Sequence, residues 1–239
     1  MQDLMLIYGT IAIDTLLTPR GEAQAVLGGS GAYAALAARL VSDKLALMGV
    51  VGDDFPECFT QALESHGVSM QHVCRLEGES FQWTGQYEDD MNKRWTVSTT
   101  EGVQDVWQPL IPEGLHNCSL MLSCNVRPDL QWQIIEQCSP EALLMVDFMK
   151  SGLEREPAYV AAILAKTDIA LLNEEEAEYF AQSPDWEQQA RAIMAAGARY
   201  AIIKLGSKGA ILFHQAEGGE LLRYDCPAYP LPEALAPTG

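Results

Sequence analysis

The feature that most constrains this chain is a repeated alternation of apolar runs with helical patterns. Runs rich in Leu, Ile, Val and Met predict strands at Leu4–Ile13, Leu45–Val51, Ser119–Cys124, Leu143–Phe148, Ile169–Leu172, Tyr200–Leu205 and Gly209–Phe213. Helical periodicity lies between most of them, over residues 32–40, 55–66, 129–138, 157–166 and 185–196. Strands that are apolar on both faces and alternate with helices favour a parallel sheet covered by helices on each side. We therefore predict an α/β fold with a doubly wound, mostly parallel sheet.

The stretch Ser80–Thr100 departs from this alternation. Phe81, Trp83 and Tyr87 lie at period-two spacing, a polar turn follows, and the alternation resumes at Trp95. The pattern predicts a β-hairpin with one aromatic face. Such a hairpin cannot easily join the core of a parallel sheet, so its apolar face needs another partner. A lid over a ligand, or a contact between two copies of the chain, would supply one.

The charge of the chain argues against two classes of partner. Its 15 Lys and Arg against 33 Asp and Glu give a net charge of −18, and no basic run occurs. Such a chain repels nucleic-acid backbones and anionic lipid. No apolar run approaches the roughly 18 residues of a membrane helix, the N-terminus lacks the basic region of a signal peptide, and the six cysteines include no C-x-x-C pair. We expect a soluble, cytoplasmic protein without nucleic-acid or membrane partners.

A glycine-rich turn, Gly28-Gly29-Ser30-Gly31, runs into an alanine-rich helix that contains Tyr33. The first amides of such a helix lie at the positive end of its dipole and suit an oxygen-rich ligand. A tight turn and close packing of helix on sheet would require the same small residues. Both interpretations remain open on the sequence.

The same segment also fits a dinucleotide-binding fingerprint. Gly29, Gly31 and Ala34 satisfy G-x-G-x-x-A, and Asp53 follows about twenty residues later. The fingerprint requires a strand before the turn, whereas Gly21–Leu27 is a poor strand. A dinucleotide-binding oxidoreductase is therefore the weaker alternative.

Three adjacent acids open another predicted helix. Asn173-Glu174-Glu175-Glu176 follows the apolar run Ile169–Leu172. Acids at a helix N-terminus are stabilising on their own, so capping explains them. Carboxylates at the edge where α/β sheets bind ligands would also hold Mg²⁺ through water molecules. The sequence favours neither explanation.

A second glycine-containing turn joins two predicted strands. Lys204, Gly206, Ser207, Lys208 and Gly209 form either a turn with solvated lysines or a nest of backbone amides for phosphate oxygens. The P-loop motif G-x-x-x-x-G-K-[ST], G-x-S-x-G and H-E-x-x-H do not occur, and the four histidines show no ligand spacing with the cysteines. P-loop NTPase, hydrolase and zinc-enzyme hypotheses therefore have no support.

Taken in order, these pieces resemble the ribokinase-like, or PfkB, family of carbohydrate kinases over the whole chain. Each piece alone is weak, but seven in sequence order make a specific signal. They are Gly9-x-x-x-x-Asp14, Gly28-Gly29, Val51-Gly52-x-Asp54, the hairpin, Asn173-x-x-Glu176, Lys204-Leu205-Gly206-Ser207-Lys208-Gly209 and Pro237-Thr238-Gly239.

The resemblance implies a ribokinase-like fold and ATP-dependent phosphorylation of a hydroxyl group on a small sugar or polyol. It implies ATP and Mg²⁺ as cofactors, with Glu176 as the metal ligand. The implied substrate-binding residues are Asp14, Gly28, Gly29, Ser30, Tyr33 and Asn125. The implied nucleotide-binding residues are Asn173, Glu176, Lys204, Gly206, Ser207, Gly209, Thr238 and Gly239.

The resemblance also implies a single domain over residues 1–239, with lid segments at about residues 14–27 and 79–101. A lid would close over the substrate and exclude water. A homodimer through the lid is the candidate assembly.

Two departures from the family pattern shape these expectations. Tyr33 stands where ribokinase-like patterns carry an amide, and an aromatic suits a ring face better than a hydroxyl. The family motif continues as G-A-G-D, whereas this chain ends at Gly239, so we expect the catalytic Asp and the C-terminal part of the fold to lie beyond it and the chain to be inactive. The alternatives are a nucleoside or inositol kinase of the same family, or a non-catalytic sugar-binding remnant.

Overall fold

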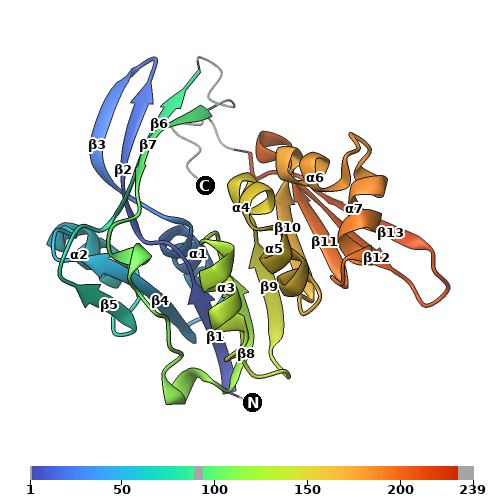
Figure 1. Ribbon diagram of the computed structural model, residues 1–239, viewed down its shortest axis with the longest axis horizontal. Coiled ribbons are helices and arrows are strands. Elements are labelled where there is room, and N and C mark those ends of the chain that lie inside the picture. Colours follow the sequence, from blue (N-terminus) through green and yellow to red (C-terminus); the bar gives the residue numbers. More distant parts are fainter. Residues whose placement is uncertain (1, 89–93, 231–239) are drawn as a thin grey trace. The chain divides into compact units, whose positions relative to one another are not determined.

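The computed structural model describes residues 2–88 and 94–230. They form two compact units, one reaching to Cys118 and the other starting at Ser119. Figure 1 labels the helices and strands of both.

The first unit consists mainly of strands. Its elements are β1 (Gln2–Tyr8), β2 (Ala12–Thr18), β3 (Gly21–Gly28), α1 (Ser30–Arg39), β4 (Leu45–Gly52), α2 (Glu57–Ser65), β5 (Val73–Leu76), β6 (Phe81–Tyr87), β7 (Arg94–Thr100) and the 3₁₀ turns η1 (Gly102–Asp105) and η2 (Glu113–Leu115).

Three of these strands, in the order β1-β4-β5, pair in parallel. In β4, every residue after Leu45 is buried. A parallel strand covered on both faces needs an unbroken apolar run, which is the pattern of Leu45–Val51 in the sequence.

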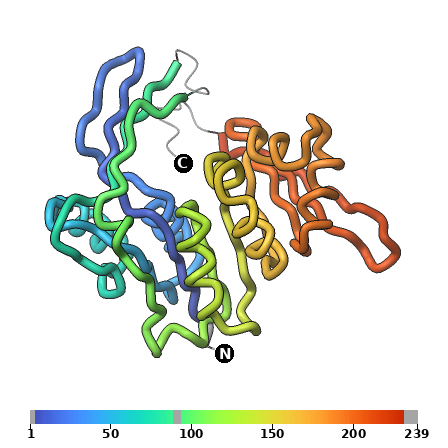
Figure 2. Tube along the Cα trace, viewed as in Figure 1, coloured from blue at the N-terminus to red at the C-terminus, as the bar shows by residue number. Residues whose placement is uncertain are grey.

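The other four strands form a separate sheet in the order β3-β2-β6-β7. Here β2 and β3 form one antiparallel hairpin, β6 and β7 form a second, and β2 pairs with β6 in parallel. Figure 2 shows the two hairpins side by side, in blue and green. The predicted hairpin is therefore half of a four-stranded sheet, which we call the lid sheet.

Two sequence predictions about strands were wrong. The apolar run Leu4–Ile13 is not one strand, because the chain leaves β1 after Tyr8 and enters the lid sheet at Ala12. The segment Gly21–Leu27, taken as a poor strand, lies in β3. Residues 21–25 of β3 are exposed, so this edge strand forms without the apolar residues that identify a buried one.

The aromatic residues of the second hairpin do not all share one face. The register pairs Gln86 with Trp95 and Gly85 with Thr96. Directly opposed residues point to the same face of a sheet. Trp95 therefore lies on the face opposite to that of Tyr87, in a strand whose residues are all exposed.

The second unit alternates strands and helices. Its elements are β8 (Cys118–Ser123), α3 (Pro128–Ile135), β9 (Leu143–Asp147), α4 (Lys150–Arg155), α5 (Pro157–Leu164), β10 (Ile169–Asn173), α6 (Glu174–Ala181), α7 (Trp186–Ala195), β11 (Tyr200–Lys204), the 3₁₀ turn η3 (Gly206–Lys208), β12 (Ala210–Gln215) and β13 (Leu221–Cys226).

Strands β8, β9, β10 and β11 are parallel neighbours, and β12 and β13 extend the sheet in antiparallel fashion. Helices α3 and α5 pack together, as do α6 and α7. The carboxyl ends of the four parallel strands meet at one edge, which is where open α/β sheets bind ligands. Within the described ranges, no helix is both long and apolar enough to cross a membrane.

Candidate functional site

Asp14 lies inside β2, the second strand of the lid sheet. Its register pairs it with Val26 of β3 and with Trp83 of β6. Only 6% of the residue is exposed, and none of the described residues donates a hydrogen bond to its carboxylate. A buried carboxylate without a donor is costly, so a ligand that brings hydroxyl groups would satisfy it.

The protonation of Asp14 reflects this environment. Burial raises its pKa from 3.8 to about 6, and the positive charge of Arg94 acts in the opposite direction. Arg94 does not form an ion pair with Asp14 among the contacts within the described ranges, so the carboxylate keeps most of its burial cost.

Two tyrosines accompany this carboxylate. The hydroxyl of Tyr33 donates to the carbonyl oxygen of Leu27 at 3.0 Å, which ties α1 to β3. Tyr87 is 3% exposed. Burial raises its pKa, the positive charge of Arg94 opposes this, and the nearby Asp14 and Tyr33 raise it further. The four ionisable groups therefore lie close enough to interact.

Trp83 lies beside them on the same face of the lid sheet. Its indole Nε1 donates to Thr96 Oγ1 at 3.0 Å, and the Arg94 guanidinium lies 5.9 Å from the centroid of its ring. A Cβ atom on Gly85 would meet the ring at 1.9 Å, so the glycine leaves room for the indole. The ring is thus held along β6, one strand away from Asp14.

The glycines of the turn before α1 meet packing demands. A Cβ on Gly28 would lie 2.1 Å from Asp14 Oδ2. Gly29 has φ +95°, and a Cβ there would lie 2.3 Å from the carbonyl oxygen of Thr10. The amide of Gly31 donates to that same carbonyl at 2.9 Å, and Ser30 begins α1. The tight turn therefore accounts for these glycines, and it brings the backbone of Gly28 against Asp14.

In the second unit, three polar residues end neighbouring strands. Asp147 ends β9, Asn173 ends β10 and Lys204 ends β11, where Asn173 pairs with Lys204. The ammonium of Lys204 forms an ion pair and hydrogen bond with Asp147. Sequence reasoning missed Asp147, although an acid at the end of the predicted strand Leu143–Phe148 falls at the ligand-binding edge of the sheet.

Buried groups surround this ion pair. Burial raises the pKa of Asp147, which Lys204 lowers by its charge and hydrogen bond. Burial also raises the pKa of the Cys124 thiol, as does the charge of Asp147. Gln131 donates to the carbonyl oxygens of Cys124 and Asp147 at 3.0 and 2.9 Å, which joins the ends of β8 and β9. No motif marked Cys124 or Gln131 in the sequence.

Asn173 and Glu176 form a capping box at the start of α6. The Asn173 side chain accepts from the Glu176 amide at 2.9 Å, and Glu176 Oε2 accepts from the Asn173 amide at 2.7 Å. Of the two neighbouring acids, Glu175 pairs with Lys150, and Glu174 lies 4.0 Å from Lys208. The capping that one of the two explanations for these acids predicted is therefore present, and the other explanation, Mg²⁺ binding, stays a prediction.

Most backbone amides of the turn after β11 are engaged in hydrogen bonds within the turn. The amides of Leu205, Lys208 and Gly209 donate to carbonyl oxygens inside the turn. A Cβ on Gly209 would meet the carbonyl oxygen of Cys226 at 2.0 Å, and Gly206 has φ +57°. Among the described residues, neither the Gly206 amide nor the Ser207 amide donates to a carbonyl oxygen of this turn.

Three predicted residues remain, namely Asn125, Thr238 and Gly239. Asn125 follows β8 in the second unit, where its Nδ2 donates to Met149 Sδ at 3.3 Å, so it is not in the unit that holds Asp14. Thr238 and Gly239 lie outside the described residues. No cluster of three or more His, Cys, Asp or Glu suited to a metal occurs in residues 2–88 and 94–230.

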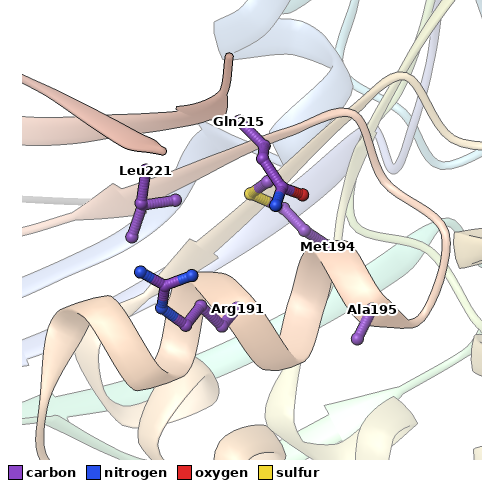
Figure 3. A pocket seen from close by; sticks show the side chains of 5 residues that line it. All are labelled: Arg191, Met194, Ala195, Gln215 and Leu221. Atoms are coloured by element: carbon purple, nitrogen blue, oxygen red, sulfur yellow. The ribbon is translucent and has the colours of Figure 1, made fainter. Parts of the chain in front are cut away.

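The second unit has a shallow cavity of about 230 Å³ between α7 and the hairpin of β12 and β13 (Figure 3). Its lining residues are Arg191, Met194, Ala195, Gln215 and Leu221. It includes none of the predicted site residues.

Comparison with protein families identifies the chain. Residues 5–229 match the model of the pfkB family of carbohydrate kinases. The chain belongs to the PfkB family. The family assignment confirms the resemblance drawn from the seven motifs.

Its PfkB relatives include nucleoside and sugar kinases. A cytidine kinase from Thermococcus kodakarensis is 28% identical over 245 residues, covering 100% of this chain and 84% of the relative. A nucleoside kinase from Burkholderia thailandensis, solved with inosine, superposes with a TM-score of 0.78 at 20% identity, covering 98% of this chain and 79% of that one. Ribokinase from Giardia lamblia superposes with a TM-score of 0.80 at 16% identity, covering 99% and 78%.

These matches confirm the predicted ribokinase-like α/β fold of this PfkB protein. They also argue against the alternative of a dinucleotide-binding oxidoreductase. The objection raised from the sequence, that Gly21–Leu27 is a poor strand, was wrong, because Gly21–Gly28 is a strand. The valid objection is topological: β3 and β4, on either side of α1, belong to different sheets and do not form a parallel pair.

Proposed function

We propose that this PfkB-family protein is a nucleoside kinase, which transfers the γ-phosphoryl group of ATP to a hydroxyl of a nucleoside. The observation that carries the proposal is the surroundings of Asp14. Its buried carboxylate has no donor among the described residues and lies beside Tyr33, Trp83 and Tyr87. A ligand with paired hydroxyls and a flat ring would donate to the carboxylate and would stack on the aromatic side chains.

The carboxylate would accept hydrogen bonds from the vicinal hydroxyls of the ribose. With a pKa of about 6, Asp14 is ionised at neutral pH, and hydrogen bonds to an ionised acceptor are the stronger ones. The aromatic rings would contact the base. A small sugar, our first expectation, has no aromatic ring to stack on these side chains, and the relatives named as cytidine and nucleoside kinases support the nucleoside alternative.

The nucleotide would be held by the second unit. Lys204 and the amides of Gly206 and Ser207 offer positive charge and donors to phosphate oxygens. Relatives solved with ADP, and with ribose and ATP, support a nucleotide as the second ligand.

Mg²⁺ fits this unit as a partner of the phosphates. Glu176 supplies one hard carboxylate, and Mg²⁺ takes its other ligands readily from phosphate and water. When bound, the ion would neutralise charge that develops on the transferring phosphoryl group. Asn173 would fix the carboxylate through the capping box.

The lid sheet would cover the acceptor, and its outer strand would join two copies of the chain. All residues of β7 are exposed, including Trp95 and Val97 at 46% and 52%. An exposed edge strand with apolar side chains is a template for pairing, so we propose a homodimer through β7. The cytoplasm, where ATP is abundant and thiols stay reduced, is the proposed location.

The test measures calorimetric affinity for a panel of nucleosides, free sugars and inositol, followed by phosphoryl transfer from ATP with Mg²⁺ to the compounds that bind. The proposal expects nucleosides to be the preferred acceptors, and Asp14→Asn to weaken their binding by about tenfold or more in calorimetry, because the acceptor loses its charge. Asp43→Asn, which changes an exposed carboxylate of the same unit, is the matched control. Equal use of free ribose or fructose would contradict the nucleoside assignment.

A further inference from the structure

One of the connections between the lid sheet and the rest of the first unit is a three-residue segment, Gly78–Ser80, which we call the lid root. It follows β5, a strand of the parallel sheet, and leads directly into β6 of the lid sheet. It therefore sets where β6 begins. The sequence motif Val51-Gly52-x-Asp54 lies against this segment, and the proposed function gives that motif no role.

Asp54 and Ser80 form the centre of the joint. Asp54 Oδ1 accepts from the Ser80 amide at 2.7 Å and from the Ser80 hydroxyl at 2.6 Å. Ser80 Oγ in turn accepts from the Gly52 amide at 2.9 Å. Asp54 Oδ2 accepts from Gln82 Nε2 at 3.3 Å. Ser80 is fully buried, so water does not compete with Asp54 for the amide and hydroxyl of Ser80, and the charge-assisted bonds keep their strength.

The rest of the lid root is held from two sides. The Asp53 amide donates to Gly78 O at 3.1 Å, and the Gly78 amide donates to Asp53 Oδ1 at 3.3 Å. From the other root of the hairpin, the Val103 amide donates to Glu79 O at 2.8 Å. A Cβ on Gly52 would meet Gly78 O at 2.1 Å, so the two segments lie in direct contact.

This joint fixes β6 against β2. Ser80 directly precedes Phe81, which pairs with Ala12, and the parallel register runs on through Asp14 opposite Trp83. A shift of the lid root would move the β6 aromatic residues along the strand that carries Asp14. The register of β6 at Asp14 therefore depends on where Ser80 is held.

We propose that Asp54 and Ser80 are positioning residues for acceptor binding. They fix the lid root, and so hold Trp83 and Tyr87 of β6 in place beside Asp14. The link to the acceptor rests on the proposed function, whereas the mechanical role of the joint does not.

The experiment measures hydrogen exchange of backbone amides and ligand affinity in Ser80→Ala, Asp54→Ala and Asp54→Asn. We expect amides of residues 81–87 to exchange about tenfold faster or more in the two alanine variants, because charge-assisted bonds are lost. Asp54→Asn, which keeps an acceptor oxygen, should give a smaller increase. Amides of residues 45–51 in β4 and those of the second unit should exchange as before.

Nucleoside affinity should fall about tenfold in the alanine variants while ADP affinity stays within about twofold, a split that general destabilisation would not produce. Ser65→Ala and Asp43→Ala, exposed positions of the same unit, are the matched controls. Unchanged exchange in residues 81–87 would overturn the proposal. So would faster exchange with nucleoside affinity unchanged. If the unmodified chain binds no nucleoside, the proposed function fails, and exchange alone decides whether the joint holds β6.

Discussion

Asp14 weakens the fold at neutral pH. Its pKa is about 6 in the folded chain against 3.8 as its ordinary value, so the folded state retains the proton at higher pH than the unfolded state. Its contribution to stability is complete below pH 3.8 and is lost as the pH rises through about 6. Asp14→Asn should therefore raise the free energy of unfolding near pH 8 by up to about 3 kcal/mol, with little gain near pH 4.

Urea unfolding at both pH values checks this prediction. The exposed Asp43, 2.7 Å from Arg39, serves as the control, since Asp43→Asn should show no comparable gain at the higher pH. The same stability gain in Asp14→Asn at both pH values would mean that ionisation is not its cause.

The ion pair of Asp147 and Lys204 should respond unequally to loss of either partner. Lys204→Met leaves a largely buried carboxylate, 22% exposed, without its cation and should cost about 2 kcal/mol, after allowance for screening at a partly exposed lysine. Asp147→Asn leaves an ammonium whose side chain is 39% exposed, and should cost less than about 1 kcal/mol. Thermal and urea unfolding of the two variants measure the difference; equal costs would contradict it.

At the level of single elements, α6 separates helix capping from metal binding. Asn173→Ala removes the cap and should cost about 1 kcal/mol of stability without any ligand. Glu176→Gln keeps a capping-box acceptor and should leave stability nearly unchanged. If Glu176 also serves Mg²⁺, the same variant should lose most of the Mg²⁺ dependence of ADP binding measured by calorimetry. Retention of that dependence would leave capping as its only role.

The elements that could be predicted from the sequence are those buried or partly buried along their whole length, such as β4 and β10. Their apolar runs are unbroken because helices or strands cover each side. The exposed edge strand β3 has no such run, so periodicity could not find it. The face of Trp95 depends on a register shift between Thr84 and Gly85, which no alternation pattern records.

For the whole molecule, assembly is the property most open to test. If β7 forms the dimer contact, Trp95→Glu should convert dimer to monomer in sedimentation velocity experiments, because a buried charge without a partner disfavours the interface. Val106 is 74% exposed in the same unit and provides the control, so Val106→Glu should leave the assembly unchanged. A monomeric unmodified chain would contradict the dimer.

The candidate site could be predicted only in part, because the sequence shows local motifs but not contacts between distant residues. Motifs that lie within a few residues, such as Gly28-Gly29 and Asn173-x-x-Glu176, can be read locally. Asp147 and Ser80 matter through partners far away in the chain, Lys204 and Asp54, and sequence spacing does not encode such pairs. The resemblance to the family came from the order of weak motifs along the chain, and the match of residues 5–229 to the family model confirmed it.

The contact between Gly28 and Asp14 also constrains how this protein can evolve. A methyl group at position 28 would lie 2.1 Å from the carboxylate, so the two positions cannot vary independently. A lineage that gains alanine at position 28 must first shorten the side chain at position 14. In a library that randomises both positions, the surviving clones should show strong epistasis, with Asp at 14 found together with Gly at 28.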